Sequence, residues 1–385
     1  MKKALATILA LVMALGLTTA AWAEGEGATK VAKIGDTEYA TLQEAVNAAA
    51  NGQTIVLQSN VVLTASLNVA AGKTVTLDLN SCKITADMNG PHMICNAGNL
   101  TITDSSENKT GEIAKIGAET NFGYVIENHG TMTLDRCKIS STSVKSSAIE
   151  NGWYTASENT AGTSCIMTIQ NAEVVSVNAA GGLYTVKNDD YGVMVINGGV
   201  FTNGVAGAGA VLNWNDLTIN GGTFTGASAV RTLKSGSSDF ETGKSQIKNG
   251  TFNGGIDTLD GYKTGITIAV TGGTFSTDVK EYLAEGKILQ KNGDTYTAVT
   301  NSGITSGTYT AKPTVPDGYK VVENTDGTFT VEKVGGYYYY YPTTDTKTTD
   351  TKGSPKTFDA GIALYVGMAL TSAAGVAFVG KKRED

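Results

Sequence analysis

The chain has 385 residues, of which only 17% are charged, and its net charge is −7. Glycine is abundant, with 47 residues, whereas proline occurs only 5 times. Nucleic-acid binding requires a basic stripe or patch, and the sequence contains none, so we expect no nucleic-acid partner. A chain of this length would allow two or three ordinary domains, but a repeat protein escapes that estimate because its core grows with its length.

Residues 1–23 have the three parts of a secretory signal. Two lysines precede a short apolar run, and Ala21-Trp22-Ala23 forms a small-x-small cleavage site. A first membrane helix is the alternative, but the apolar run is short and meets that site. We therefore expect a signal peptide, with the mature chain beginning at Glu24.

A short amphipathic helix is expected near the start of the mature chain. Thr41-Leu42-Gln43-Glu44 has the spacing of a capping box, an alanine-rich run follows, and Asn51-Gly52 ends the helix. Because the chain then continues as strands, we expect this helix to cover the open end of a stack of strands, whose unpaired edge would otherwise invite association.

A phrase of the type Asn-Gly-Gly-Thr-Phe recurs in the middle of the chain. A period of 20 to 50 residues is typical of repeat proteins, in which each unit buries its apolar face by stacking on its neighbours. The phrases end, 23, 28 and 23 residues apart, at Phe201, Phe224, Phe252 and Phe275. Related Thr-Leu and Thr-Ile phrases extend this file backwards through Ile84, Ile113, Ile139 and Val174. Eight coils at about 4.8 Å each predict a stack roughly 35 Å long.

A second file of residues runs beside the phenylalanines. Asparagine tolerates the left-handed backbone of a sharp bend, and stacked amide side chains can hydrogen-bond along a file. We expect such a ladder to fade toward the C-terminus, where Thr232 and Thr258 take the equivalent positions. An asparagine stands two places after a β-branched apolar residue at Asn96, Asn128, Asn151, Asn188 and Asn213.

The distribution of proline separates the two repeat folds that this pattern allows. Pro91 and Pro313 bracket 221 residues without a proline. Proline has no N–H to donate and is excluded from interior strands, so its absence fits a ladder that is unbroken from coil to coil. Arrays of β-sandwiches, the alternative, usually carry prolines at edges and turns. The sequence thus predicts an all-β fold, a parallel β-helix or solenoid with its N-terminal cap, over residues 24–275.

A C-terminal cap is expected over residues 276–334. Ser276-Thr277-Asp278 offers the N-cap of a short helix that extends to about Leu283. Two hairpins follow, one around Asn292-Gly293 and one near Gly327. Residues 335–359 are low in complexity, with five consecutive tyrosines and then Thr, Asp and Lys repeats, and are expected to form a tether.

The C-terminus contains a candidate transmembrane helix. Residues 360–380 carry no charge and as a helix span about 31 Å, the thickness of a bilayer core. The basic tail, residues 381–385, places that end in the cytoplasm by the positive-inside rule. A buried soluble helix is the alternative, but it would not end in a cationic stop so close to the terminus. Together with the signal peptide, this helix predicts a cell-surface location for the residues in between.

A short motif lies just before this apolar segment. Ser354-Pro355-Lys356-Thr357-Phe358, the apolar span and the basic tail together resemble the LPxTG-type sorting signals of Gram-positive surface proteins. Pro355 and Thr357 match the motif, Ser354 fits a variant of its first position, and Phe358 stands where the family has glycine. The resemblance implies an anchor in the cell envelope, either by linkage to the wall through a sortase or by retention in the membrane.

The repeats themselves carry a second resemblance. The phrase from Ile34 to Ala45, the phrase from Thr76 to Asn80 and the Gly-Gly-Thr-Phe units resemble repeat-rich surface proteins of Gram-positive gut bacteria. That class has a pectate-lyase-like, right-handed β-helix. The resemblance implies display on a Gram-positive cell and adhesion to a host or dietary glycan or protein. Because the class contains both polysaccharide-degrading enzymes and binding proteins, fold alone leaves the function open.

Enzymes of that class use clustered aspartates on a glycosidic bond or as calcium ligands. Asp189 and Asp190 form the best candidate pair, for which a polar turn is the alternative. The Gly-His-Gly segment of the hydrolases is matched only in part by Asn128-His129-Gly130, and no Arg-x-Lys segment follows. We therefore expect a non-catalytic adhesin or binding module that needs no cofactor or metal. A polysaccharide lyase or glycoside hydrolase is the first alternative and a purely structural spacer is the second.

Aromatic residues beside the predicted corners are the candidates for ligand binding. Aromatic faces stack on sugar rings and anchor protein interfaces. The alternative is that these side chains merely cover apolar edges of the solenoid. The candidates are Trp153, Tyr154, Tyr184, Tyr191 and Trp214.

The four cysteines, Cys82, Cys95, Cys137 and Cys165, follow no metal-ligand spacing. Cys82 and Cys137 are expected in one file with Ser105 on the rung between them, which would separate them by roughly 9.6 Å, beyond disulfide reach. We expect small core fillers and leave a disulfide elsewhere open.

Overall fold

A computed structural model describes residues 29–117, 121–142, 147–154, 158–159, 161–177, 183–234 and 243–335. The chain divides into two compact units, residues 1–334 and 335–385, and apart from Gly335 all described residues belong to the first. The predicted signal peptide, the sorting motif, the apolar segment 360–380 and the basic tail lie outside the described residues. Within them, no helix is long and apolar enough to cross a membrane.

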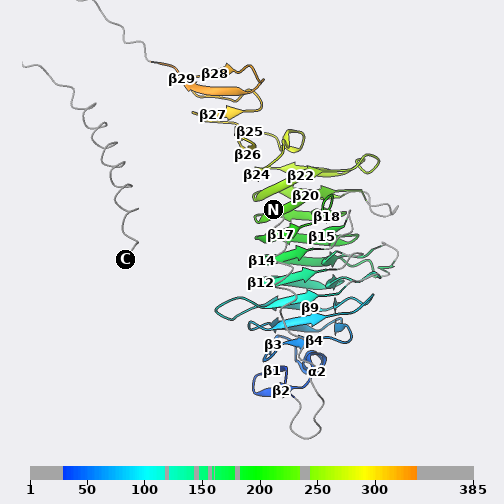
Figure 1. Ribbon diagram of the computed structural model, residues 1–385. Helices are drawn as coiled ribbons and strands as arrows, with labels where there is room; N and C mark the ends of the chain where they lie inside the picture. Colours follow the sequence, from blue (N-terminus) through cyan, green and yellow to red (C-terminus); the bar gives the residue numbers. More distant parts are fainter. Residues whose placement is uncertain are drawn as a thin grey trace, which may run out of the picture. The chain divides into compact units, whose positions relative to one another are not determined.

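The described part is all-β apart from short helices, and its strands form one large, mostly parallel sheet. Each repeat contributes up to three strands, and each strand pairs with the equivalent strand of the next repeat. Three files of parallel strands result, which we call the first, second and third files. Figure 1 shows these strands stacked in chain order, with α2 and β1 at one end.

The three files follow from the strand pairings. The first contains β3 (Gln53–Leu57), β6 (Thr74–Asp78), β9 (Asn99–Thr103), the starts of β12 (Thr131–Ser141) and β14 (Cys165–Ser176), β16 (Gly192–Ile196), β19 (Asp216–Ile219), β21 (Lys244–Ile247) and β23 (Thr267–Val270). The second contains β4 (Val61–Val62), β7 (Lys83–Ala86), β10 (Glu112–Lys115), the ends of β12 and β14, β17 (Gly199–Asn203), the starts of β20 (Thr223–Thr232) and β22 (Thr251–Asp257), and β24 (Thr274–Phe275). The third contains β5 (Leu67–Val69), β8 (Ile94–Asn96), β11 (Ile126–Asn128), β13 (Ile149–Asn151), β15 (Tyr184–Asn188), β18 (Gly209–Asn213) and the ends of β20 and β22.

The predicted file of apolar residues is confirmed in the second strand file. The register joins Ile84, Ile113, Ile139, Val174, Phe201, Phe224, Phe252 and Phe275 in that order. The four phenylalanines are fully buried, and their rings stack with centroids 4.9, 5.0 and 5.0 Å apart and planes within 9° of parallel. The spacing of strands in a sheet thus brings aromatic faces into contact.

The glycine of each Gly-Thr-Phe phrase is required by this stack. Gly222, Gly250 and Gly273 have φ values of +112°, +133° and +113°, which disfavour any residue with a Cβ. A Cβ there would also lie 3.0 to 3.3 Å from a phenylalanine ring of the file. The recurring phrase therefore combines a strained turn with the ring that packs beneath it.

The asparagine ladder is confirmed in the third file. Each amide donates to the side-chain oxygen of the next asparagine, from Asn96 to Asn128 (2.7 Å), Asn151 (2.7 Å), Asn188 (2.8 Å) and Asn213 (2.8 Å). Asn213 donates onward to Ser245 Oγ at 3.0 Å, and Thr232 occupies the next position of its file, as predicted. Because every amide has a partner, a polar file can lie inside an apolar core.

The capping box at Thr41 is also confirmed, with both reciprocal hydrogen bonds present. The helix α2 (Leu42–Ala48) ends earlier than predicted, because Ala49 is already extended and leads into β3. Strand β1 (Ala32–Ile34) pairs with β2 (Thr37–Tyr39) and, antiparallel, with the free edge of β3. The amide of Gln43 bonds both the N–H and the C=O of Asn68 in β5. The N-terminal segment thus covers open edges of two files.

At the other end, antiparallel strands replace the parallel ladder. Both predicted hairpins are present, β25 (Lys287–Asn292) with β26 (Thr295–Thr300) and β28 (Tyr319–Glu323) with β29 (Phe329–Lys333), while β27 (Gly307–Tyr309) bridges them. Strand β26 pairs with β24 and so covers the last edge of the second file. The predicted helix is only one 3-10 turn, η2 (Lys280–Tyr282), because Leu283 is already extended.

The prediction that Ser105 lies on the rung between Cys82 and Cys137 is wrong. Gly111, not Ser105, lies on the rung between Cys82 and Cys137, since Lys83, Glu112 and Lys138 are in register. Ser105 lies in the loop after β9, where its hydroxyl donates to the Asp78 carboxylate at 2.5 Å. All four cysteines are free thiols; Cys137 and Cys165 are buried, and Cys82 and Cys95 are half-buried.

Replacing Phe252 by alanine is expected to destabilise the stack by about 3–5 kcal/mol, the usual cost of removing a buried aromatic side chain. Its ring contacts Phe224 on one side and Phe275 on the other. Urea unfolding followed by circular dichroism measures this cost. Thr251→Ala, an exposed neighbour on the same strand, is the control and should change stability little. A loss below about 1 kcal/mol in Phe252→Ala would contradict the stacked file.

Candidate functional site

The outer face of the third file carries a row of chemically varied side chains. In a strand, the residue between two inward-facing residues points outward, so the middle position of each Ile-x-Asn phrase points away from the core. We call this set the outer row. The register places its members on successive rungs in the order Cys95, Glu127, Glu150, Lys187, Leu212, Arg231 and Asp257.

Glu150 is the most deeply buried carboxyl group of this row, with a side chain only 2% exposed. The hydroxyl of Tyr124 donates to its Oε1 at 2.9 Å, and Lys187 Nζ lies 3.6 Å from the same oxygen. The pKa of Glu150 is raised to about 8, chiefly by burial; Lys187 opposes the rise and the neighbouring Asp189 contributes to it. The group is therefore largely protonated at neutral pH.

Glu127, on the preceding rung, contacts two imidazoles and hydrogen-bonds with the Cys95 thiol. His92 Nε2 lies 3.3 Å and His129 Nε2 3.8 Å from its Oε1. Burial raises the pKa of Glu127, with a contribution from Glu158. Burial, aided by His92, lowers the pKa of His129 to about 4, so this imidazole is neutral at physiological pH.

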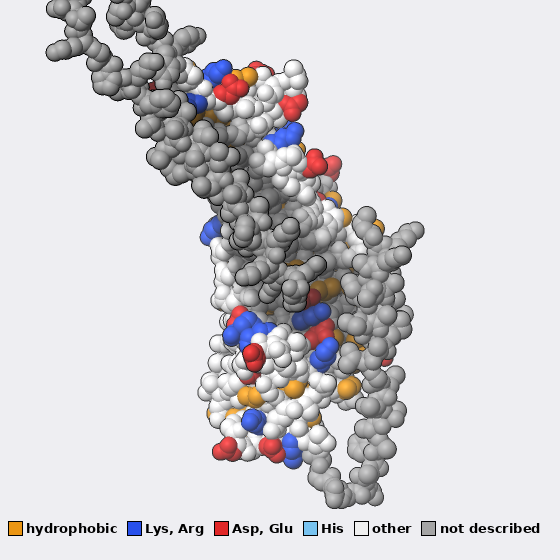
Figure 2. All heavy atoms as spheres, turned by 60° about the vertical axis from the view of Figure 1, so that its left-hand side comes forward, with side chains coloured by type: hydrophobic (Ala, Val, Ile, Leu, Met, Phe, Trp, Pro, Cys, Tyr) orange, Lys and Arg blue, Asp and Glu red, His pale blue; other side chains and the backbone are white. Residues whose placement is uncertain are grey.

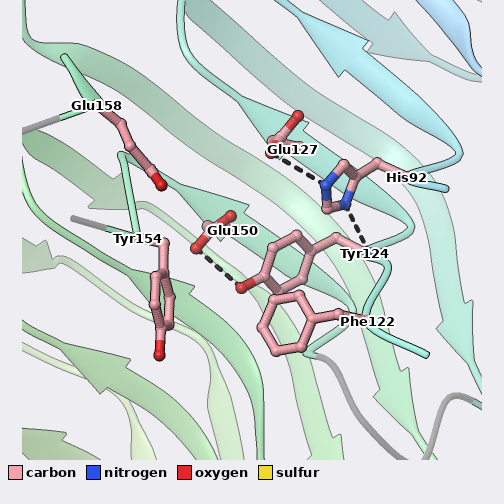
Figure 3. Close-up of a pocket in the computed structure, with 7 residues that line it drawn as sticks. All are labelled: His92, Phe122, Tyr124, Glu127, Glu150, Tyr154 and Glu158. Atoms are coloured by element: carbon pink, nitrogen blue, oxygen red, sulfur yellow. Dashed lines mark hydrogen bonds and ion pairs between the residues drawn. The ribbon is translucent and has the colours of Figure 1, made fainter. Parts of the chain in front are cut away.

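A pocket of about 410 Å³ opens over Glu127 and Glu150. Phe122 and Tyr154 are exposed, whereas only 2% of Tyr124 is exposed. Figure 3 shows Tyr154 on one side of Glu150 and the rings of Phe122 and Tyr124 on the other. The lining side chains are His92, Phe122, Tyr124, Glu127, Glu150, Tyr154 and Glu158.

The rings of the pocket stand nearly perpendicular to one another. Phe122 meets Tyr124 edge to face at 5.2 Å and 80°, and meets Tyr154 at 6.1 Å and 72°. His92 instead stacks on Tyr124 at 5.1 Å and 12°. The Nδ1 atom of His92 accepts the backbone N–H of Tyr124 at 3.0 Å, which leaves Nε2 to carry the proton toward Glu127.

A buried lysine holds the loops that supply this wall. Lys115, in β10, is only 1% exposed. Its ammonium group donates to the carbonyl of Pro91 at 2.6 Å and to that of Gly123 at 3.1 Å. Because these residues directly precede His92 and Tyr124, the lysine fixes both loops from inside the coil. A Cβ at Gly123 would collide with this ammonium group and with two backbone carbonyls.

The structure brings part of the predicted aromatic set to this site. Tyr154 is 61% exposed and lines the pocket. Trp153 donates its backbone N–H to Asp190 O at 2.9 Å and stacks on His129 with centroids 3.6 Å apart. Tyr191, half-buried, occupies the turn after β15 with φ of +63°. Of these three residues, Tyr154 lines the pocket.

The other two predicted aromatic residues lie elsewhere. Tyr184, at the start of β15, is only 5% exposed, and the guanidinium carbon of Arg231 lies 5.8 Å from its ring centroid. Trp214 follows β18 and meets Tyr262 edge to face at 6.0 Å. Neither residue lines the pocket.

The predicted aspartate pair is buried. Asp189 and Asp190 are 4% and 3% exposed. The Asp189 carboxylate contacts Lys187 Nζ, and its other oxygen accepts the backbone N–H of Asp190 at 3.1 Å. The pair forms the turn between β15 and β16, and its neighbour Glu150, rather than either aspartate, faces the pocket. This arrangement matches the polar turn that the sequence left as the alternative.

Sequence reasoning missed most of the residues that define the pocket. Glu127, Glu150 and Lys187 occupy the middle of the Ile-x-Asn and Val-x-Asn phrases that predicted the ladder. The alternation of strand side chains would have placed them on one outer row. No comparable signal marked His92, Phe122 or Tyr124, which precede the strands in loops of unequal length.

Charges of both signs are mixed on the face of the molecule that Figure 2 draws. Figure 2 shows acidic and basic side chains in mixed groups, and wide areas between these groups carry neither charged nor hydrophobic side chains. In the part of the chain that the structure describes, no group of three or more His, Cys, Asp or Glu side chains is arranged to hold a metal ion.

Comparison with known proteins gives no match. No family model, curated protein or solved structure is similar to this chain.

The raised pKa of Glu150 predicts that folding is weakened by alkali. The folded group binds a proton more tightly than the unfolded one, whose pKa is 4.5, so stability should fall as pH rises from about 4.5 to 8. Thermal melting from pH 5 to pH 9 measures this fall. Glu150→Gln keeps an acceptor for Tyr124 and should flatten the profile and raise the melting temperature at pH 9. Glu173→Gln, an exposed control, should keep the wild-type profile; a parallel profile in Glu150→Gln would contradict the assignment.

Proposed function

We propose that the protein is a non-catalytic binding module, an adhesin displayed on the surface of a Gram-positive bacterium. Its stacked coil is proposed to be a right-handed parallel β-helix of the pectate-lyase-like kind. The in-register parallel files support this fold. The secretory signal at residues 1–23, the motif at residues 354–358 and the apolar segment at residues 360–380 support export and anchoring in the envelope.

The ligand proposed for the pocket is a glycan of host or dietary origin. One observation carries this proposal: three aromatic side chains and three carboxyl groups from successive coils converge on one open pocket. Aromatic faces pack on the apolar faces of sugar rings, while carboxylates accept hydrogen bonds from hydroxyl groups. A volume of about 410 Å³ lies in the range of small-molecule sites.

A glycoside hydrolase that uses Glu150 and Glu127 is a second candidate. The observation that favours it is the pKa of Glu150, raised to about 8 by burial, which suits a general acid. The two glutamates stand on adjacent rungs of the same outer row, and retaining enzymes place two carboxyl groups about 5–5.5 Å apart. In such a hydrolase the catalytic carboxyl groups would be Glu150 and Glu127, instead of the buried pair Asp189 and Asp190 that the sequence suggested.

A glycan array probed with the purified full chain tests the binding proposal. Wild-type protein is expected to bind at least one glycan, and Tyr154→Ala should weaken that binding roughly tenfold, because an aromatic anchor contributes about 1–2 kcal/mol. Tyr262→Ala, which removes a ring outside the pocket, is the matched control and should bind as wild type.

Two outcomes would contradict this proposal. Equal loss in both tyrosine variants would mean that the pocket is not the binding site. Release of reducing ends from a bound glycan, abolished in Glu150→Gln, would establish the hydrolase instead.

Fractionation of the native cells tests the anchor. If a sortase joins Thr357 to the wall, muralytic digestion should release the protein without detergent, and Thr357→Ala should shift it to the detergent-soluble membrane fraction. Protein that requires detergent in both cases would indicate membrane retention. Recovery of the protein in the cytosol would contradict surface display.

A further inference from the structure

We infer that the pocket over Glu127 and Glu150 is built to bind an organic cation, and that its natural ligand is a glycan with free amino groups. This inference rests on the proposed function, because it uses the same pocket and narrows the ligand to one chemical class. It follows from the charges, the ring geometry and the burial of the lining residues.

The pocket holds more acidic groups than the protein neutralises. Of the seven described residues that line it, three are glutamates and none is a lysine or arginine. Lys187 contacts Asp189 and lies 3.6 Å from Glu150. Among the described residues, the partners of Glu127 are two imidazoles and the Cys95 thiol, and the imidazole of His129 is held neutral. A cation entering the pocket would therefore meet more carboxyl groups than ammonium groups among the described residues.

The aromatic wall has the form that cations prefer. The ring of Phe122 lies at 80° to that of Tyr124 and at 72° to that of Tyr154, so the pocket is bounded by faces and edges of different orientation. Ammonium groups bind to aromatic faces through the ring quadrupole, most strongly when they are desolvated. The protein already places one ammonium in such contact, since Lys187 Nζ lies 4.8 Å from the centroid of Tyr154.

Burial makes these carboxyl groups responsive to a cation. A carboxylate in a poorly solvated site is costly unless a positive charge lies nearby. The described groups that face Glu150 are Tyr124 from the loop before β11, Glu127 from β11, Cys165 from the start of β14, and Lys187 and Asp189 from β15 and its turn. Only Lys187 among them is positive. A bound cation would favour the ionised form of Glu150 and release its proton.

The sign of the pH dependence follows from this linkage. The pKa of Glu150 is raised to about 8, so at pH 6 the cation must displace a proton, whereas at pH 9 the carboxylate is already ionised. Affinity for a cation of fixed charge should therefore rise with pH, by up to about tenfold per unit below pH 8. A neutral sugar would show no such rise, and an acidic glycan would be repelled throughout.

Titration calorimetry with the purified full chain tests the inference. The probes are choline, whose charge does not titrate, and oligomers of glucosamine, N-acetylglucosamine and glucose of equal length. We expect choline to bind at least tenfold more tightly at pH 9 than at pH 6. At pH 7 the glucosamine oligomer should bind at least tenfold more tightly than the other two oligomers.

Three variants connect these results to the pocket. Glu150→Gln should remove the pH dependence of choline binding, and Glu127→Gln should weaken choline binding about tenfold at pH 9. Glu173→Gln, an exposed glutamate of the second file with a side chain 51% exposed, should behave as wild type. Melting temperatures measured on the same samples show that each variant is folded.

The outcomes separate this inference from the function on which it rests. Equal binding of glucosamine, N-acetylglucosamine and glucose oligomers would overturn the cation inference and leave glycan binding intact. Binding of choline without any oligomer would support the cation pocket and overturn glycan binding. No binding of any probe would overturn both. Displacement of choline by Ca²⁺ at equimolar concentration would show a metal site and overturn the organic ligand.

Discussion

The in-register stacking of parallel strands is the constraint on which the rest of this structure depends. Each position of the coil meets its equivalent on the next rung about 4.8 Å away, so a residue is suitable only if it can pack against a copy of itself. Phenylalanine meets this condition with faces 4.9 to 5.0 Å apart. Asparagine meets it as both donor and acceptor, with amide contacts of 2.7 to 2.8 Å.

Charged residues meet the same constraint on the outside only by alternation. In the second file, Lys83, Glu112, Lys138 and Glu173 stand on successive rungs, and each pair of neighbours lies within 3.8 Å. The outer row of the third file breaks this rule, because Glu127 and Glu150 are adjacent. Burial raises the pKa of each, with Glu158 adding to the rise for Glu127 and Asp189 adding to it for Glu150, and the pocket lies where the alternation fails.

The same distinction explains what the sequence could predict. The Phe and Asn files could be predicted because stacking repeats a residue type at each rung. Both files are confirmed at the positions named above. Loops between strands are free of that condition, so their lengths differ and their register is not encoded by repetition. Ser105 was assigned to the wrong rung for this reason, and His92, Phe122 and Tyr124 gave no signal. Glu127 and Glu150, by contrast, were predictable from the strand alternation.

The interior supports the conclusion that the site lies where the repeat is least regular. Lys115 is in register with Ala86 on one side and Ser141 on the other, and Ser176 and Asn203 continue that inward position. A lysine is the exception in a file of small or polar uncharged residues, and its ammonium group is bound to the loops that carry His92 and Tyr124. The inward-facing Lys115 and the outward-facing Glu127, each an exception to its file, thus lie in consecutive strands, β10 and β11. Regular stacking forms the buried core, and the departures from it position the side chains that line the pocket.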